Sequence, residues 1–294
     1  MFADLHIHSQ YSDGLLDISS IISDARNKGI EVIALTDHDT INGVIEMKKK
    51  IWDIETIPGI EITVSKKMHI LGYFIDYKSC MLKKILDRMA LKRARWLIRL
   101  IREISKEKGV EFGDFLKTYE NVTVKTVNRW IRDMGDNRCS KDEVYDMYFW
   151  NSANPYGKYP TFSSKEAVDL INTSGGVAVL AHPALVWESK EQFEDLLESL
   201  MREGLKGLEV YHVLNAKAGL QEYFAEVAMQ KRLLISGGSD FHGDRNKRTY
   251  IGEYGLLEKE WEMFRQCRGK YNQKLQDIIE GKDTNLLYER FKNI

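Results

Sequence analysis

The sequence has little of three features that would each assign it to a class of protein. Its three cysteines, Cys80, Cys139 and Cys267, lie far apart and form no CxxC pair, which argues against a disulfide framework and a thiolate metal site. No run of about 18 apolar residues occurs, as a membrane span requires. No basic stretch followed by an apolar run and a cleavage site opens the chain. We therefore expect a cytoplasmic protein with no membrane partner.

Net charge and glycine-rich loops are also lacking. The 43 basic and 44 acidic residues leave a net charge of −1, which argues against a globally basic protein that coats nucleic acid. Neither GxGxxG nor GxxxxGKS occurs, so nothing indicates a nucleotide-binding open sheet. The 294 residues, 43% hydrophobic and 30% charged, are enough for one large globular α/β domain that carries a subdomain.

The alternation of strand and helix patterns predicts an α/β barrel. Strands are expected at the opening stretch and at 31–36, 56–64, 68–75, 177–183, 207–212 and 233–236, and helices at 17–29, 41–52, 163–175, 191–202 and 216–231. Seven strands that mostly alternate with helices favour a closed or nearly closed parallel barrel, with a doubly wound open sheet as the alternative. Strands 56–64 and 68–75 are close enough to form a hairpin.

Long helical patterns interrupt this alternation. Residues 80–160 are expected to form a helical insertion, and residues 1–79 and 161–294 the barrel. Residues 256–294 are expected to be mainly helical.

The positions of the histidines are the first indication of a functional site. All seven histidines follow or end stretches that read as strands, and none lies in the long helical patterns. His6 and His8 are two apart, so they face the same side of an extended strand, while Leu5 and Ile7 face the other side. This pair can act as a two-pronged ligand.

Functional side chains of an α/β barrel gather at the carboxyl ends of its strands. That template places ten side chains on one rim: His6, His8, Asp13, His38, Glu61, His69, His182, His212, Asp240 and His242. Such crowding is costly without cations, so we expect two to three divalent ions. Mixed nitrogen and oxygen donors without sulfur suit Mn, Fe or Zn. The alternative, that each histidine is an isolated polar residue at a strand end, is disfavoured for the whole set. Asp4 and Asp37 are expected to orient the histidines.

Five motifs in order carry a family resemblance. Residues 4–14, 36–39, 58–61, 181–183 and 238–243 together resemble the PHP (polymerase and histidinol phosphatase) phosphoesterases. The resemblance implies a distorted seven-stranded (β/α)7 TIM-like barrel, the PHP fold, with a trinuclear metal centre. It also implies three groups of ligands: His6, His8, Glu61 and Asp240; Glu61 as a bridge with His69 and His182; and Asp13, His38 and His242.

The resemblance also implies a reaction, namely hydrolysis of a phosphate ester by a hydroxide that bridges the metal ions. The leaving oxygen needs a proton donor, for which we expect His212, the one histidine outside the implied ligand set, with Asp37 as the second candidate.

A basic stripe marks the expected insertion. Within 81–109, Lys and Arg recur every three or four residues beside an apolar face, which is typical of a solvated helix surface. Arg93 and Arg95 are the candidates for binding a second phosphate of the substrate.

The finer resemblance, carried by residues 159–160, 166–167 and 175–183, is to the PHP subfamily that acts on nucleoside 3',5'-bisphosphates and on the 5' end of short RNA. We therefore expect a small phosphorylated substrate or short RNA, and no obligatory protein partner. The alternatives are a cyclic or sugar phosphate phosphodiesterase or phosphatase, then a histidinol phosphatase, and last a non-catalytic metal-dependent sensor.

Overall fold

The chain folds into two compact units. A computed structural model describes residues 1–119, 122–134, 139–151, 154–243 and 249–266. Residues Met1–Leu86 and Phe162–Ile294 form the barrel unit, and Asp87–Thr161 form the helical unit. The division falls within helix α3 (Cys80–Lys108) rather than at residue 80. Among the described residues, none of the helices combines the length and apolar character needed to cross a membrane.

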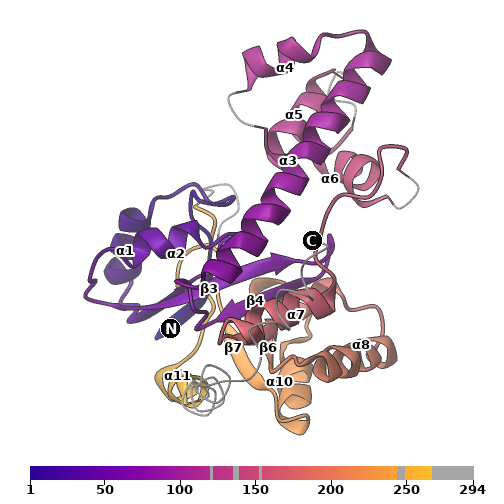
Figure 1. Cartoon of the computed structure of the whole chain (residues 1–294). Coiled ribbons are helices and arrows are strands. Elements are labelled where there is room, and N and C mark those ends of the chain that lie inside the picture. Colours follow the sequence, from indigo (N-terminus) through magenta and orange to yellow (C-terminus); the bar gives the residue numbers. More distant parts are fainter. Residues whose placement is uncertain (120–121, 135–138, 152–153, 244–248, 267–294) are drawn as a thin grey trace. The chain divides into compact units, whose positions relative to one another are not determined.

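The barrel unit is built on one sheet whose seven strands keep their chain order in space. They are β1 (Ala3–Ile7), β2 (Val32–Leu35), β3 (Glu55–Thr63), β4 (His69–Tyr73), β5 (Val177–Leu180), β6 (Gly207–Tyr211) and β7 (Leu234–Gly237) (Figure 1). β4 runs antiparallel to β3 and β5, and all other neighbours are parallel. A parallel bridge between Ile7 and Phe241 joins the two sheet ends. The predicted nearly closed α/β barrel, with its one hairpin, is thus confirmed.

Helices cover the strands of the barrel unit. They are α1 (Ile18–Asn27), α2 (Asn42–Met47), α7 (Ser164–Thr173), α8 (Lys190–Glu203), α9 (Val213–Lys217), α10 (Gln221–Gln230) and α11 (Glu258–Arg265), with a 3-10 turn, η2 (Pro183–Leu185). Helix α7 packs on β4 and β5, and α10 packs on β6 and β7. The single helix expected at 216–231 is two helices, because Gly219 adopts a φ of +69° and turns the chain between them. The helix expected over 41–52 ends at Met47, and residues 267–294 of the expected C-terminal helical stretch lie outside the described residues.

The helical unit has its own elements and core. After most of α3 come α4 (Phe112–Thr118), α5 (Val124–Met134), α6 (Lys141–Tyr145) and a π-helical turn, η1 (Asp146–Trp150). Its buried core includes Trp96, Leu100, Phe115, Trp130 and Phe149. The helices therefore bury an apolar face within the unit, as the pattern of residues 81–109 predicts.

Two apolar clusters sandwich the strands of the barrel. Val32 and Ala34 of β2 belong to one cluster, together with Trp261 of α11. The alternate residues of the same strand, Ile33 and Leu35, pack with α1 and α2 in the other cluster. A strand buried on both faces is mostly apolar, so a polar side chain within it needs a buried partner.

Candidate metal centre

One rim of the barrel collects the polar side chains, and strand direction explains how. Parallel strands end at a common edge, so His8, His38 and Asp240 follow the carboxyl ends of β1, β2 and β7. His69 stands instead at the first residue of β4. Because β4 is antiparallel, its beginning lies at the same rim.

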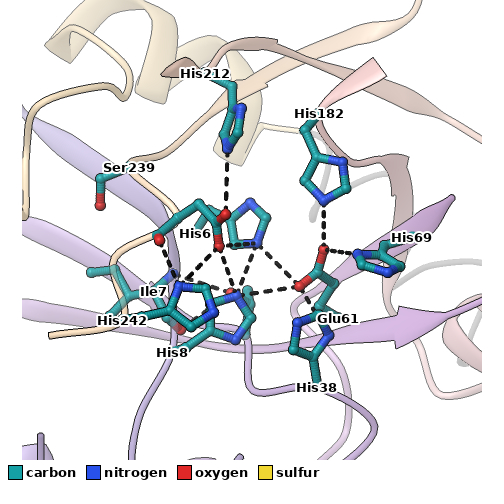
Figure 2. Close-up of polar contacts among 12 residues, drawn as sticks. His6, Ile7, His8, His38, Glu61, His69, His182, His212, Ser239 and His242 are labelled. Atoms are coloured by element: carbon teal, nitrogen blue, oxygen red, sulfur yellow. Dashed lines mark hydrogen bonds and ion pairs between the residues drawn. The ribbon is translucent and has the colours of Figure 1, made fainter. Parts of the chain in front are cut away.

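Glu61 of β3 is the centre of this group. Its side chain is 1% exposed, and Figure 2 shows His38, His69 and His182 pointing toward it. One oxygen, Oε1, is 3.0 Å from both His69 Nδ1 and His182 Nε2. The other, Oε2, is 3.3 Å from His6 Nε2, 3.2 Å from His8 Nε2 and 3.2 Å from His38 Nδ1. Five imidazoles from four segments thus face one carboxylate.

Asp240 supplies a second carboxylate. Its Oδ1 lies 3.2 Å from His8 Nε2, 3.4 Å from His242 Nδ1 and 3.6 Å from His6 Nε2, and its Oδ2 lies 3.8 Å from His212 Nε2. The residue adopts a φ of +52°, a left-handed conformation that costs free energy outside glycine and is typical of functional sites.

Asp13 completes a third group. Its Oδ1 is 3.1 Å from His242 Nε2 and 3.7 Å from His8 Nδ1, and the His8 and His242 rings stack with centroids 4.3 Å apart. The four residues His8, Asp13, His38 and His242 each offer one donor atom, and these atoms all lie within 4.8 Å of one another.

The donor atoms fit divalent metal ions. Ligands about 2.0–2.2 Å from a metal ion must lie about 3–3.5 Å from each other, which is close to most of the separations around Glu61. The Nε2 atoms of His6 and His8 are 3.1 Å apart and face the same carboxylates. Two imidazole nitrogens that share a cation need no proton between them, so cation binding relieves this crowding. The cluster is therefore able to bind metal ions.

Comparison with known proteins agrees with this geometry. Residues 4–277 match the PHP domain family. The chain belongs to the PHP family.

Three curated relatives of this PHP chain are named as enzymes that hydrolyse phosphate esters. A phosphoribosyl 1,2-cyclic phosphate 1,2-diphosphodiesterase of Eggerthella lenta is 27% identical over 280 residues, which cover 86% of this chain and 98% of the relative. A 3',5'-nucleoside bisphosphate phosphatase of Chromobacterium violaceum is 29% identical over 81% of this chain and 86% of its own length. The 5'-3' exoribonuclease Rnm of Escherichia coli is 26% identical over 81% and 84%. The predicted family and the predicted class, a hydrolase of phosphoric esters, are confirmed.

Solved structures share the PHP fold of this chain. An amidohydrolase from Chromobacterium violaceum, with bound sulfate and no metal, superposes with a TM-score of 0.71 at 26% identity over 91% of this chain and 97% of that one. A protein from Bifidobacterium adolescentis superposes with a TM-score of 0.70 at 23% identity over 90% and 96%.

The pKa values of residues in the PHP site are shifted in different directions. Burial alone would raise the pKa of Glu61, but the surrounding histidines, His38 first, hold it well below its usual range. Burial would likewise lower the pKa of His8, but its hydrogen bonds to Asp240 and Glu61 raise it to about 10. For His38, burial dominates and lowers the pKa to about 4. The carboxylates are therefore charged at neutral pH, and His8 carries a proton when no metal is bound.

Asp37 holds the loop after β1. Its oxygens accept hydrogen bonds from the Ser9 N–H at 2.7 Å, the Ser9 hydroxyl at 2.7 Å and the Ser12 hydroxyl at 2.6 Å. The Asp37 side chain is fully buried. These three bonds fix the segment that carries His8 and Asp13.

Asp4 does the same for the loop after β7. Its carboxylate accepts hydrogen bonds from the Ser239 N–H at 3.0 Å, the Ser239 hydroxyl at 2.6 Å and the Gly252 N–H at 2.8 Å. Gly238 lets this loop approach β1, because a Cβ there would lie 2.3 Å from the His6 backbone nitrogen. The bonds to Asp4 and this close approach set Asp240 beside His6.

Two buried side chains of the site were not expected from the sequence. Glu209 of β6 contacts His6 Nδ1 at 2.8 Å and the His182 N–H at 2.6 Å. Asn215 donates to the Glu209 carbonyl and accepts from the Ala184 N–H. The sequence did offer one indication of Glu209: a carboxylate in the middle of an apolar strand is rare unless it is paired with another group.

The structure places the ten rim residues together in the barrel unit, and the two arginines belong to the helical unit. Arg93 donates from Nε to the Pro160 carbonyl at 2.9 Å and lies over the Tyr159 ring, 5.4 Å from its centroid. Arg95 is exposed. Both belong to the helical unit, so their role toward the substrate stays a proposal.

Metal binding should displace protons from the PHP site. Because His8 keeps a proton up to a pH of about 10 in the metal-free protein, a metal ion that takes its lone pair releases that proton. We expect Mn²⁺ affinity to rise between pH 6 and pH 8 by about tenfold per pH unit for each proton displaced. Titration calorimetry in two buffers of different protonation enthalpy measures the release. An affinity that is flat or falls with rising pH would contradict the assignment.

Proposed function

We propose that this chain is a metal-dependent phosphoesterase that removes the phosphate monoester of a small nucleotide-type substrate, such as a nucleoside 3',5'-bisphosphate, or acts at the 5' end of short RNA. The main support for this proposal is the buried Glu61 carboxylate, whose oxygens have five imidazoles within 3.3 Å. Membership of the PHP family supports the reaction class. The named activities of the bisphosphate phosphatase and the exoribonuclease support the substrate class.

The proposed ligands form three groups. They are His6, His8, Glu61 and Asp240; Glu61, His69 and His182; and Asp13, His38 and His242. We propose that they hold two to three ions of Mn, Fe or Zn, since nitrogen and oxygen donors without sulfur suit these metals. When bound, divalent ions supply positive charge beside the phosphate oxygens and a water acidified to near-neutral pKa. The protein's part is to hold this arrangement rigid, through the hydrogen bonds of Asp4 and Asp37.

We assign the stabilisation of the leaving oxygen to His212. Its Nδ1 accepts a hydrogen bond from the Leu214 N–H at 3.1 Å, so the neutral ring carries its proton on Nε2. That nitrogen faces Asp240 Oδ2 at 3.8 Å, at the border of the cluster. Nε2 is therefore a hydrogen-bond donor rather than a ligand, which suits it to stabilise the negative charge that develops on the leaving oxygen. Asp37, the second candidate, already accepts three hydrogen bonds, so we give it the positioning of the loop.

A second candidate function is hydrolysis of a cyclic or sugar phosphate. The observation in its favour is the Eggerthella lenta relative, a cyclic phosphate diphosphodiesterase, of which this chain covers 98%. Histidinol phosphate hydrolysis comes next, and a metal-dependent sensor without catalysis comes last, because every proposed ligand position is filled by a residue able to bind metal.

A substrate panel tests the proposal. Mn-loaded protein should release phosphate from a nucleoside 3',5'-bisphosphate with a kcat/KM at least about tenfold above that for the 5'-monophosphate or a ribose cyclic phosphate, since a second phosphate adds charge-assisted contacts. Phosphate release is followed colorimetrically. A preference for the cyclic phosphate would transfer the assignment to the second candidate, and a fully metallated protein inert to every ester would end the enzyme hypothesis.

The loss of kcat in His212→Asn should depend on the leaving group of the substrate. For an alkyl phosphate, whose alkoxide leaves only when its negative charge is stabilised, kcat should fall by roughly 10²–10³-fold. For p-nitrophenyl phosphate, whose phenolate leaves unprotonated, kcat should stay close to that of the parent protein. Steady-state rates with metal content checked by mass spectrometry measure this difference. Equal losses with both esters would assign His212 to metal binding instead.

Arg95→Ala should act on binding of the second phosphate. We expect a KM for the bisphosphate raised about tenfold with little change in kcat, and an unchanged KM for the monophosphate. Lys106→Ala, on the same helix and ion-paired to Glu103, is the control. Arg93→Ala should add to the effect but also removes its bond to Pro160, so its unfolding midpoint must be measured beside the kinetics. If both substrates lose equally, the arginines have no role in recognising the second phosphate.

A further inference from the structure

Glu209, like Asp4 and Asp37, is a buried carboxylate that faces away from the centre of the cluster. It lies on β6, where Leu208 and Val210 on either side are also fully buried. Its Oε1 is 2.8 Å from His6 Nδ1, and its Oε2 accepts the backbone N–H of His182 at 2.6 Å. Each oxygen thus serves a different segment, β1 and the end of β5.

The contact with His6 selects which ring nitrogen can bind a metal. A neutral imidazole carries one proton, and a carboxylate beside Nδ1 keeps it there. The lone pair is then on Nε2, the nitrogen that faces His8 Nε2 at 3.1 Å and Glu61 Oε2 at 3.3 Å. With the opposite tautomer, an N–H group would point into the cluster.

The contact with His182 holds a strained backbone. His182 has a φ of +26° and a ψ of +62°, a conformation that a residue with a Cβ adopts only when its surroundings impose it. That conformation aims Nε2 at Glu61 Oε1, 3.0 Å away. Asn215 braces the same turn, since it donates to the Glu209 carbonyl at 2.9 Å and accepts from the Ala184 N–H at 3.1 Å.

We propose that Glu209 is a positioning residue that sets the tautomer of His6 and the direction of His182, so that both rings present Nε2 to the metal ions. This role rests on the proposed metal centre. A carboxylate is required because both of its contacts are N–H donors. A glutamine has one oxygen and one NH₂ group, so it can accept only one of them, and its NH₂ must face either His6 Nδ1 or the His182 N–H.

A different reading is that Glu209 itself binds a metal ion. Donor atoms of His6, Glu209 and His212 lie within 4.8 Å of one another, a spacing that one cation can span. Both oxygens of Glu209 are already within hydrogen-bond distance of N–H groups, which favours positioning. The two readings differ in the nitrogen of His6 that is metallated, Nε2 for positioning and Nδ1 for a ligand.

The test begins with the unaltered chain, loaded with Zn²⁺ and labelled with ¹⁵N-histidine. Nitrogen NMR should show His6 metallated at Nε2 with a slowly exchanging proton on Nδ1. Metallation at Nδ1 overturns the proposal, and this measurement needs no variant to fold. A chain that binds no divalent metal overturns the metal centre and this inference together.

Variants of Glu209 provide a second test of its positioning role. Glu209→Gln should weaken Zn²⁺ affinity in calorimetry by about 10–100-fold and lose the Nδ1 proton signal of His6, and Glu209→Asp should recover part of the affinity. At saturating Mn²⁺ the KM for substrate should stay within about twofold, because both oxygens of Glu209 already contact the protein, at His6 Nδ1 and at the His182 N–H. Glu198→Gln, whose carboxylate pairs with Lys231 on the surface, is the matched control. If Glu209→Gln binds Zn²⁺ as tightly as the parent while the parent hydrolyses phosphate esters, this inference fails and the proposed function stands.

Discussion

Burial of the Glu61 carboxylate among five imidazoles is the constraint on which the barrel rim depends. An ionised carboxylate out of water costs several kcal/mol unless positive charge or hydrogen bonds compensate it, and Glu61 is 1% exposed. Histidines lower its pKa despite burial, so the group stays charged and must be matched. Bound divalent ions would offset that cost, since the donor atoms lie about 3 Å apart, the spacing of ligands around one metal ion.

The fold is arranged so that these groups meet. β4 runs antiparallel to its neighbours and therefore brings His69 to the edge where the parallel strands end. Asp37 and Asp4 hold the loops after β1 and β7 through serine side chains and backbone N–H groups, and Glu209 holds β1 and the end of β5. Three carboxylates that face away from the centre thus keep rigid the carboxylates that face into it. Such rigidity lets ligands act without reorganisation when a phosphate arrives.

Most of the barrel and of the rim could be predicted from the sequence, for physical reasons. Short apolar runs between helical patterns favour buried strands, and a barrel places the carboxyl ends of its strands on one rim, so the gathering of His6, His38 and Asp240 followed from the fold class. The break at Gly219 was missed because helical periodicity continues across it and only the positive φ reveals the turn. Glu209 was missed because its partners, His6 of β1 and the N–H of His182 after β5, are distant in the sequence. Only the folded structure brings them together. The arginines depend on the helical unit, whose charge pattern fits a solvated face as well as a phosphate site.

We propose that Glu61 and its histidines hold the metal ions that support hydrolysis. The most direct test counts Mn²⁺ per chain by mass spectrometry after dialysis, for the parent protein and for Glu61→Gln, beside phosphate release from a nucleoside 3',5'-bisphosphate. We expect two to three ions in the parent protein, at least one ion fewer in the variant, and no turnover in the variant. A Glu61→Gln protein that keeps the full metal complement and hydrolyses the ester at the parent rate would contradict this proposal.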